Sequence, residues 1–199
     1  MTPLDRVQLV LASTSRYRAE LLARIAPRFA QVSPAVEETP QSGETAATLA
    51  ARLAHAKAAA VADRHVDSIV IGCDQAAELG GAILGKPGDA GAACDQLHRA
   101  SGQSVVFHTA ICLFDTRSLP SRVISAADAT RVRFRQLDDV EIEAYVARER
   151  PLDCAGSFKA EGLGIALFDS IESTDPTALI GLPLILLCRL LRQAGIAVI

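Results

Sequence analysis

The sequence predicts an α/β fold with a mixed sheet. Short apolar runs typical of strands alternate with longer segments in which apolar residues recur at helical spacing, which is the pattern of α/β proteins. Two of the strand-like runs are joined only by Gly80-Gly81, a two-residue turn that makes its flanking strands antiparallel. The chain has 199 residues, of which 50% are hydrophobic. It can therefore bury a sizeable core as one domain or two closely joined lobes.

The N-terminal part of the chain is expected to form a strand and two helices. Residues 7–12 (VQLVLA) are an apolar run typical of a buried strand, and Ser13-Thr14-Ser15 then supplies N-cap candidates for a helix. The apolar face of that helix is expected to consist of Tyr17, Leu21, Leu22 and Ile25. Residues 27–43 are expected to be extended or loop. The second helix, over about residues 44–62, presents Leu49, Leu53, Ala56 and Ala60 on one face.

Residues 69–87 (IVIGCDQAAELGGAILGKP) are expected to form a hairpin around Gly80-Gly81. Counting outward from that turn places Gln75 opposite Lys86, and directly opposed strand residues lie about 5 Å apart. Adjacent residues of a strand face opposite ways, so Asp74 joins Gln75 and Lys86 only where the strand bends or ends. An ordinary hairpin with a surface aspartate and lysine fits the same pattern.

The C-terminal part is expected to add two long strands and three helices. The long β runs are residues 104–114 and 122–134, joined by a turn that contains proline. Helices are expected at about residues 89–100 and 138–148, and a glycine-dotted segment follows at residues 154–168. The last helix is expected to have Pro183 in its first turn, at position N1, and to stop at Gly195.

Composition excludes several classes of protein. The net charge of −3, without a basic block, argues against nucleic acid or an anionic membrane surface as the main partner. The five cysteines are scattered with no C-x-x-C pair, which favours reduced thiols in a cytoplasmic protein over a disulfide framework or a zinc site. No apolar signal core follows the first residues, and no apolar run reaches the ~18 residues of a membrane span.

Four polar clusters follow apolar runs and could carry chemistry, at residues 13–18, 37–38, 74–87 and 156–162. A strand leading into a helix N-terminus with hydroxyls and Arg18 is suited to binding an anion, and loop carboxylates can bind Mg²⁺ together with substrate phosphates. Each cluster also has a plain structural reading. Arg18 and the Glu37-Glu38 pair could be solvated, Lys57 could be an exposed helical lysine, and Lys159 could pair with Glu161.

Taken together, the clusters suit a polyphosphate held with a divalent metal while water attacks phosphorus. No Ser-His-Asp or Cys-His arrangement competes with this reading. No G-x-x-x-x-G-K-[ST] loop is present, and no G-x-G-x-x-G follows a strand, so P-loop and dinucleotide-binding folds are not expected. The residues alone therefore indicate a phosphate-handling α/β protein.

Six segments, read in order, resemble the Maf family of nucleoside triphosphate pyrophosphatases: LASTSRYRAELL, VEET, LAARLAHAKA, IVIGCDQAAELGGAILGKP, CAGSFKAEGLGIALF and DPTALIGLPL. The likeness extends from about residue 7 to residue 195. It implies one domain over residues 1–199, with an elongated mixed sheet, flanking helices and two lobes around a central cleft, similar to inosine-triphosphate pyrophosphatases. It also implies hydrolysis of a nucleoside triphosphate to the monophosphate and pyrophosphate with a divalent cation (Mg, Mn or Co). The expected partners are a small-molecule nucleotide and, in a homodimer, a second copy of the chain, with no nucleic acid and no membrane.

The resemblance also assigns roles to individual residues. Asp74 matches the proton acceptor that activates water, and it is expected to share the metal with Glu38. Lys57 and Lys86 match lysines that neutralise the triphosphate and the transition state. Ser13 and Arg18 match the phosphate-binding start of the first helix. Lys159, from the polar cluster at residues 156–162, is a further expected substrate-binding residue.

Three departures from the common family pattern resemble the branch that acts on 7-methyl-GTP: Tyr17, Gln75 and Glu161. N7-methylation makes guanine cationic, and an aromatic ring facing a cation gains about 0.5–2 kcal/mol. A carboxylate can accept hydrogen bonds from the guanine N1–H and N2–H₂ groups. The alternatives are a dTTP/UTP pyrophosphatase and a non-catalytic nucleotide-binding regulator of cell division. Arg16 stands where proline is common.

Overall fold

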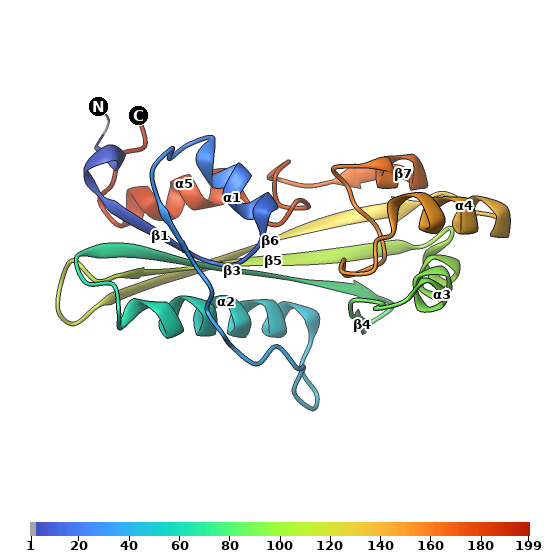
Figure 1. The fold of residues 1–199 in the computed structure, drawn as a ribbon, viewed down its shortest axis with the longest axis horizontal. Coiled ribbons are helices and arrows are strands. Elements are labelled where there is room, and N and C mark those ends of the chain that lie inside the picture. Colours follow the sequence, from blue (N-terminus) through green and yellow to red (C-terminus); the bar gives the residue numbers. More distant parts are fainter. Residues whose placement is uncertain (1–2) are drawn as a thin grey trace.

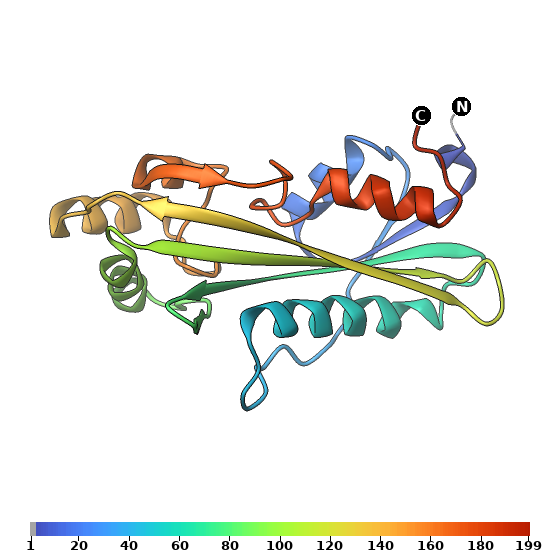
Figure 2. The ribbon, with the colours of Figure 1, turned by 180° about the vertical axis from the view of Figure 1, so that it is seen from behind.

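The computed structural model describes residues 3–199 and shows one seven-stranded mixed sheet with helices packed on both faces (Figure 1). Residues 1 and 2 of the predicted 1–199 domain lie outside the described part. The strand order is β2-β1-β3-β5-β6-β7, and β4 pairs with β3. The molecule is elongated along β3, β5 and β6 (Figure 2). The predicted mixed α/β class with flanking helices is therefore confirmed.

The strands are β1 (Gln8–Ala12), β2 (Ala30–Val32), β3 (Ser68–Leu79), β4 (Ala82–Leu84), β5 (Ser104–Asp115), β6 (Arg122–Phe134) and β7 (Phe168–Glu172). β1 runs parallel to β2 and β3, and the other pairs are antiparallel. The sequence did not predict β7, because its residues (FDSIE) are mostly exposed and do not form an apolar run.

The helices are α1 (Arg16–Ala23), α2 (Ala46–Ala62), α3 (Ala90–Ala100), α4 (Asp139–Glu149) and α5 (Leu184–Gln193), with short 3-10 turns at Leu4–Arg6 and Leu163–Leu167. The expected position of Pro183 at N1 of α5 is wrong by one residue. Pro183 has an extended backbone and occupies the N-cap position. The carboxylate of buried Asp175 accepts from the N–H groups of Ile185 and Leu186, and this satisfies the first turn in place of a capping side chain.

Regular alternation along β3 separates two apolar clusters. Ile69, Ile71 and Cys73 point toward α1 and α5, whereas Val70 and Ala76 point toward α2. A third cluster lies against α3 and α4 at the other end of the sheet. It contains Phe107, Phe134 and Phe158, and the partly buried Phe168 packs against it. Cys73 is fully buried, as expected for a small apolar group.

Gly72 allows α2 to lie directly on β3. A Cβ atom at this position would be 2.1 Å from the Ala54 carbonyl oxygen and 2.6 Å from the Ala58 nitrogen. Only glycine permits so close an approach of helix and strand backbones. The contact brings Lys57, which lies between Ala54 and Ala58, against the face of β3 that carries Asp74, two residues beyond Gly72.

The predicted hairpin is correct at its turn and wrong farther out. Leu79 pairs with Ala82 as expected, but β4 ends at Leu84, and Gln75 lies opposite Thr109 of β5. Pro87, which has no N–H to donate, soon follows this strand end. Lys86 therefore lies beyond the strand and does not pair with Gln75.

The edge of β3 that faces away from β5 is unpaired over residues 73–76. β1 pairs with β3 only up to Gly72, and β4 pairs with it only from Ala77 onward. The strand itself runs through this gap in unbroken register with β5, so Asp74 lies neither at a register shift nor at a strand end. Side chains from both faces of β3 can reach the gap.

Candidate active site

A cleft of about 780 Å³ lies at the open edge of β3. It is lined by all ten predicted site residues: Ser13, Tyr17, Arg18, Glu38, Lys57, Asp74, Gln75, Lys86, Lys159 and Glu161. They come from the start of α1, the β2–α2 loop, α2, β3, the segment after β4 and the loop after α4. The fold therefore brings together groups that lie far apart in the sequence.

Lys57 forms ion pairs with two carboxylates of the cleft, Asp74 and Glu38. Its Nζ is 2.5 Å from Asp74 Oδ1 and 2.6 Å from Glu38 Oε1. The Lys57 and Asp74 side chains are 6% and 9% exposed, whereas that of Glu38 is 49% exposed. The exposed helical lysine that the apolar pattern allowed is thus a buried cation between two carboxylates.

The two carboxylates differ in their titration. Burial raises the pKa of Asp74, and this effect exceeds the opposing charges of Lys57 and Arg18. Burial also acts to raise the pKa of Glu38, but the hydrogen bond and charge of Lys57, together with the charges of Lys86 and Arg18, outweigh it, and the pKa is lowered. Asp74 Oδ2 has no hydrogen-bond partner among the described residues. Asp74 therefore has a free oxygen and an increased affinity for a proton.

The N-terminus of α1 opens into the cleft beside two cations. Arg18 Nε donates to the Gly181 carbonyl oxygen (3.0 Å), and its Nη1 lies 3.4 Å from Ser13 Oγ. These contacts hold the guanidinium at the end of the helix where backbone N–H groups are free. Lys86 is exposed on the cleft wall and has no ion pair or hydrogen bond among the described residues. Arg18 and Lys86 are thus available to an anion.

The donor set fits a divalent cation that is shared with a phosphorylated ligand. Within residues 3–199, no three His, Cys, Asp or Glu side chains form a group that could hold a metal alone. The carboxylates of Asp74 and Glu38 nevertheless converge on one point, where Lys57 Nζ now lies. Mg²⁺ is commonly held by one or two carboxylates plus substrate phosphates, so these two residues suit it.

Tyr17 and Glu161 lie on the wall of the cleft near Arg16. The guanidinium carbon of Arg16 is 4.7 Å from the centre of the Tyr17 ring, and its Nη2 donates to the Tyr17 hydroxyl. Glu161 is exposed and makes no ion pair with Lys159 among the described contacts. The ring of Tyr17 therefore already accepts a planar cation.

Gln75 is fixed by hydrogen bonds that determine the orientation of its amide. Its Nε2 donates to Thr109 Oγ1 and to the carbonyl oxygens of Ala178 and Leu179. Because carbonyl oxygens only accept, the nitrogen must point toward them. The Gln75 carbonyl oxygen makes no hydrogen bond within the described part of the chain.

The sequence profile of the family described as "Maf-like protein" matches residues 8–194. The chain belongs to the Maf family. A protein from Xanthomonas oryzae pv. oryzae (strain MAFF 311018), named 7-methyl-GTP pyrophosphatase, is 55% identical over 188 residues, covering 94% of this chain and 97% of its own. Proteins of the same name from Albidiferax ferrireducens and Burkholderia thailandensis are 50% and 53% identical, covering 99% and 94% of this chain and 98% and 88% of theirs. The Staphylococcus aureus Ham1 structure aligns with a TM-score of 0.43 and 16% identity, covering 79% of this chain and 89% of that one.

In this Maf protein, the Lys159 ammonium already has hydrogen-bond partners outside the cleft. Its Nζ donates to the carbonyl oxygens of Glu149 (2.9 Å) and Arg150 (3.5 Å) at the end of α4. Cations are favourable at a helix C-terminus. Lys159 lines the cleft, and its contact with substrate stays a prediction.

Arg52, which binds the loop that carries Glu38, was not among the residues predicted for the site. The sequence does contain one indication: Glu44 and Arg52 carry opposite charges near the start of the predicted helix 44–62. Sequence spacing alone gave no reason to connect them to the site.

No helix among residues 3–199 is long and apolar enough to span a membrane.

Proposed function

We propose that this Maf family member hydrolyses 7-methyl-GTP to 7-methyl-GMP and pyrophosphate and so limits incorporation of modified nucleotides. The observation that carries the proposal is the buried Lys57 between Asp74 and Glu38, in a cleft that also presents Arg18 and Lys86. The names of relatives at 50–55% identity over nearly their whole length support the substrate. We further propose that the chain forms a single two-lobed domain and assembles as a homodimer. A cytoplasmic location is also proposed, and the five free cysteines are consistent with it.

The phosphate groups are proposed to lie between the start of α1 and Lys86. Arg18 is held in place by Gly181 and Ser13 before any ligand arrives, so little further ordering is needed on binding. Lys86 and Lys57 would neutralise the negative charge that develops as the anhydride breaks, and one such preorganised donor is worth about 10²–10³ in rate.

Asp74 Oδ2 is proposed to take the proton from water. The water oxygen forms a bond to the α phosphorus while the bond from that phosphorus to the oxygen bridging the α and β phosphates breaks, and pyrophosphate leaves with the bridging oxygen. Burial raises the pKa of Asp74, and general bases work best when their pKa approaches the operating pH. A divalent cation (Mg, Mn or Co) held by Asp74 and Glu38 would neutralise phosphate charge.

The base is proposed to lie against Tyr17 and Glu161. Because the Tyr17 ring already accepts the guanidinium of Arg16, it suits the cationic ring of 7-methylguanine. The Glu161 carboxylate would accept from the N1–H and N2–H₂ edge and favour a cation over neutral uracil. Gln75, with its carbonyl oxygen unpaired, adds an acceptor.

A substrate panel tests the proposed function. Purified protein with Mg²⁺, Mn²⁺ or Co²⁺ is assayed for pyrophosphate release from 7-methyl-GTP, GTP, dTTP and UTP. The highest kcat/KM is expected for 7-methyl-GTP. A higher value for dTTP or UTP would assign the chain to that alternative activity. No release from any nucleotide would favour the non-catalytic binding protein.

Replacing Glu161 with glutamine is expected to reduce the preference for 7-methyl-GTP over GTP and UTP about tenfold. A charge-assisted hydrogen bond becomes neutral, and the attraction for the cationic base is lost. The measurement is the ratio of kcat/KM values across the panel. Glu143→Gln on the exposed side of α4, which does not line the cleft, serves as the control and should leave the ratio unchanged. An unchanged ratio in Glu161→Gln would remove Glu161 from base selection.

A further inference from the structure

The position of Glu38 depends on side chains of α2. Residues 33–40, between β2 and the turn before α2, make no backbone–backbone hydrogen bond within the described part of the chain. A loop of this kind is held by the contacts of its side chains and by hydrogen bonds between side chains and its backbone. Lys57 holds the Glu38 carboxylate itself, and a second contact from α2 holds the next residue, Thr39.

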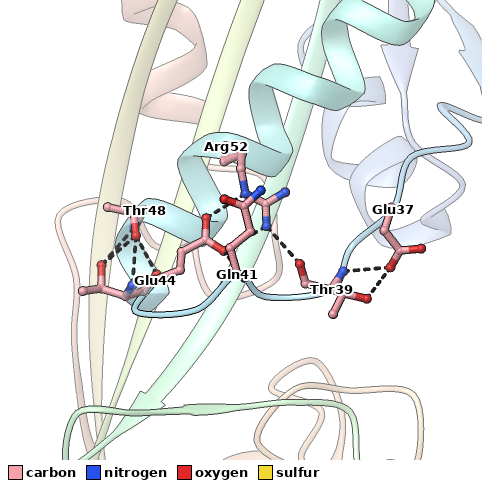
Figure 3. Close-up of polar contacts among 7 residues, drawn as sticks. Glu37, Thr39, Gln41, Glu44, Thr48 and Arg52 are labelled. Atoms are coloured by element: carbon pink, nitrogen blue, oxygen red, sulfur yellow. Dashed lines mark hydrogen bonds and ion pairs between the residues drawn. The ribbon is translucent and has the colours of Figure 1, made fainter.

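Arg52 makes that second contact as part of a clasp with Glu44 (Figure 3). Its Nε and Nη2 donate to the two carboxylate oxygens of Glu44 at 2.7 and 2.9 Å. The same Nη2 donates to the Thr39 carbonyl oxygen at 3.1 Å. Glu44 Oε2 also accepts from the backbone N–H of Gln41. Both ends of the segment 39–44 are therefore tied to one guanidinium.

Glu37 contributes to the same local structure and not to the cleft. Its carboxylate accepts from the backbone N–H and the hydroxyl of Thr39, as Figure 3 shows. The neighbouring Glu38 lines the cleft, whereas Glu37, Thr39, Glu44 and Arg52 do not. The two adjacent glutamates thus have different tasks: Glu37 shapes the loop, and Glu38 reaches Lys57.

We propose that Arg52 is a positioning residue for Glu38. Arg52 and Lys57 lie five residues apart on α2, a rise of about 7.5 Å, and they hold the consecutive loop residues 39 and 38. Without the Arg52 contact, Thr39 has no anchor to α2, and Glu38 moves away from Lys57 and Asp74. The fork geometry matters because the single nitrogen of a lysine cannot reproduce the parallel Nε and Nη2 hydrogen bonds to the Glu44 carboxylate. The inference rests on the role proposed for Glu38.

A double-mutant cycle tests this dependence. Arg52→Ala is expected to lower kcat/KM about 10–100-fold, the usual cost of losing a group that orients a metal-binding residue. Arg52→Lys keeps the charge and should recover only part of that loss. In the Glu38→Gln background, Arg52→Ala should cost no more than about twofold further, because its effect acts through Glu38. A second readout is Mn²⁺ affinity in the presence of the product 7-methyl-GMP, expected to fall by a similar factor in Arg52→Ala.

Arg135 supplies a matched control. Its Nη1 and Nη2 bind both oxygens of Glu141 at 3.0 and 2.7 Å, and its Nε donates to the Ala166 carbonyl oxygen. This is the same kind of clasp, away from the cleft. Arg135→Ala should lower the melting temperature as much as Arg52→Ala does and leave kcat/KM and Mn²⁺ affinity within about twofold.

Three outcomes overturn the inference. If Arg52→Ala keeps wild-type kcat/KM while Glu38→Gln does not, the clasp does not position Glu38. If the two losses multiply in the double variant, Arg52 acts independently of Glu38. If Glu38→Gln itself has full activity, the role proposed for Glu38 fails first, and this result separates the two proposals.

Discussion

Replacing Asp74 with asparagine is expected to lower kcat for 7-methyl-GTP hydrolysis by about 10²–10⁴-fold, the usual contribution of a positioned general base. Asparagine keeps the shape of the side chain and can still contact Lys57 through its carbonyl oxygen. It cannot accept the proton from water, because its amide has almost no basicity. Pyrophosphate release under saturating nucleotide measures the effect.

Asp128→Asn provides the comparison for Asp74→Asn. Asp128 is a partly buried aspartate on β6 that does not line the cleft, so its amide variant should keep kcat within about twofold. Binding of 7-methyl-GTP to Asp74→Asn should persist, since Arg18, Lys86 and Lys57 remain. A variant that keeps more than a tenth of wild-type kcat would exclude Asp74 as the proton acceptor.

The elements of the fold could be predicted wherever an apolar pattern dictates them. β3, β5 and β6 are long apolar or alternating runs, and α2 has a regular apolar face, so local sequence was sufficient. β7 could not be found this way, because it forms only by pairing with the end of β6. Its residues carry no burial signal of their own.

The shape of the site depended on tertiary contacts that no local pattern contains. The cleft exists because β1 stops opposite Gly72 and β4 starts opposite Ala77, and these two strands lie far apart in the chain. Counting residues from the Gly80-Gly81 turn assumed that β4 continues to Lys86, and it does not. The resemblance to the Maf family named the residues that line the cleft, but it could not show that Asp74 reaches it from the middle of a regularly paired strand.

The burial of Lys57 was also hidden from sequence patterns. A lysine beside alanines on a helix is normally solvated, and a buried one requires carboxylates that neutralise it. Those carboxylates come from β3 and from the loop before α2, so only the folded chain shows the pairing. Arg52 remained unassigned for the same reason, since its partners Thr39 and Glu44 lie in an irregular loop.

Replacing Lys57 with methionine is expected to lower both activity and stability, in a way that depends on pH. Removing one partner of a buried ion pair typically costs about 3–5 kcal/mol. Without Lys57, the pKa of Asp74 rises further above its unfolded value of about 3.9. The folded variant then holds a proton that the unfolded chain has released, so its stability falls as the pH rises through this window. The deficit relative to wild type should therefore be larger at pH 8 than at pH 5.

Urea unfolding in metal-free buffer at the two pH values measures the deficit, and pyrophosphate release at pH 8 is expected to fall at least 10²-fold. Lys86→Met separates the two effects, because Lys86 is exposed and unpaired among the described residues. That variant should lose activity but keep wild-type stability at both pH values. An equal stability deficit of Lys57→Met at pH 5 and pH 8 would show that Lys57 does not control the charge of Asp74. The burial of Lys57 would then serve packing alone.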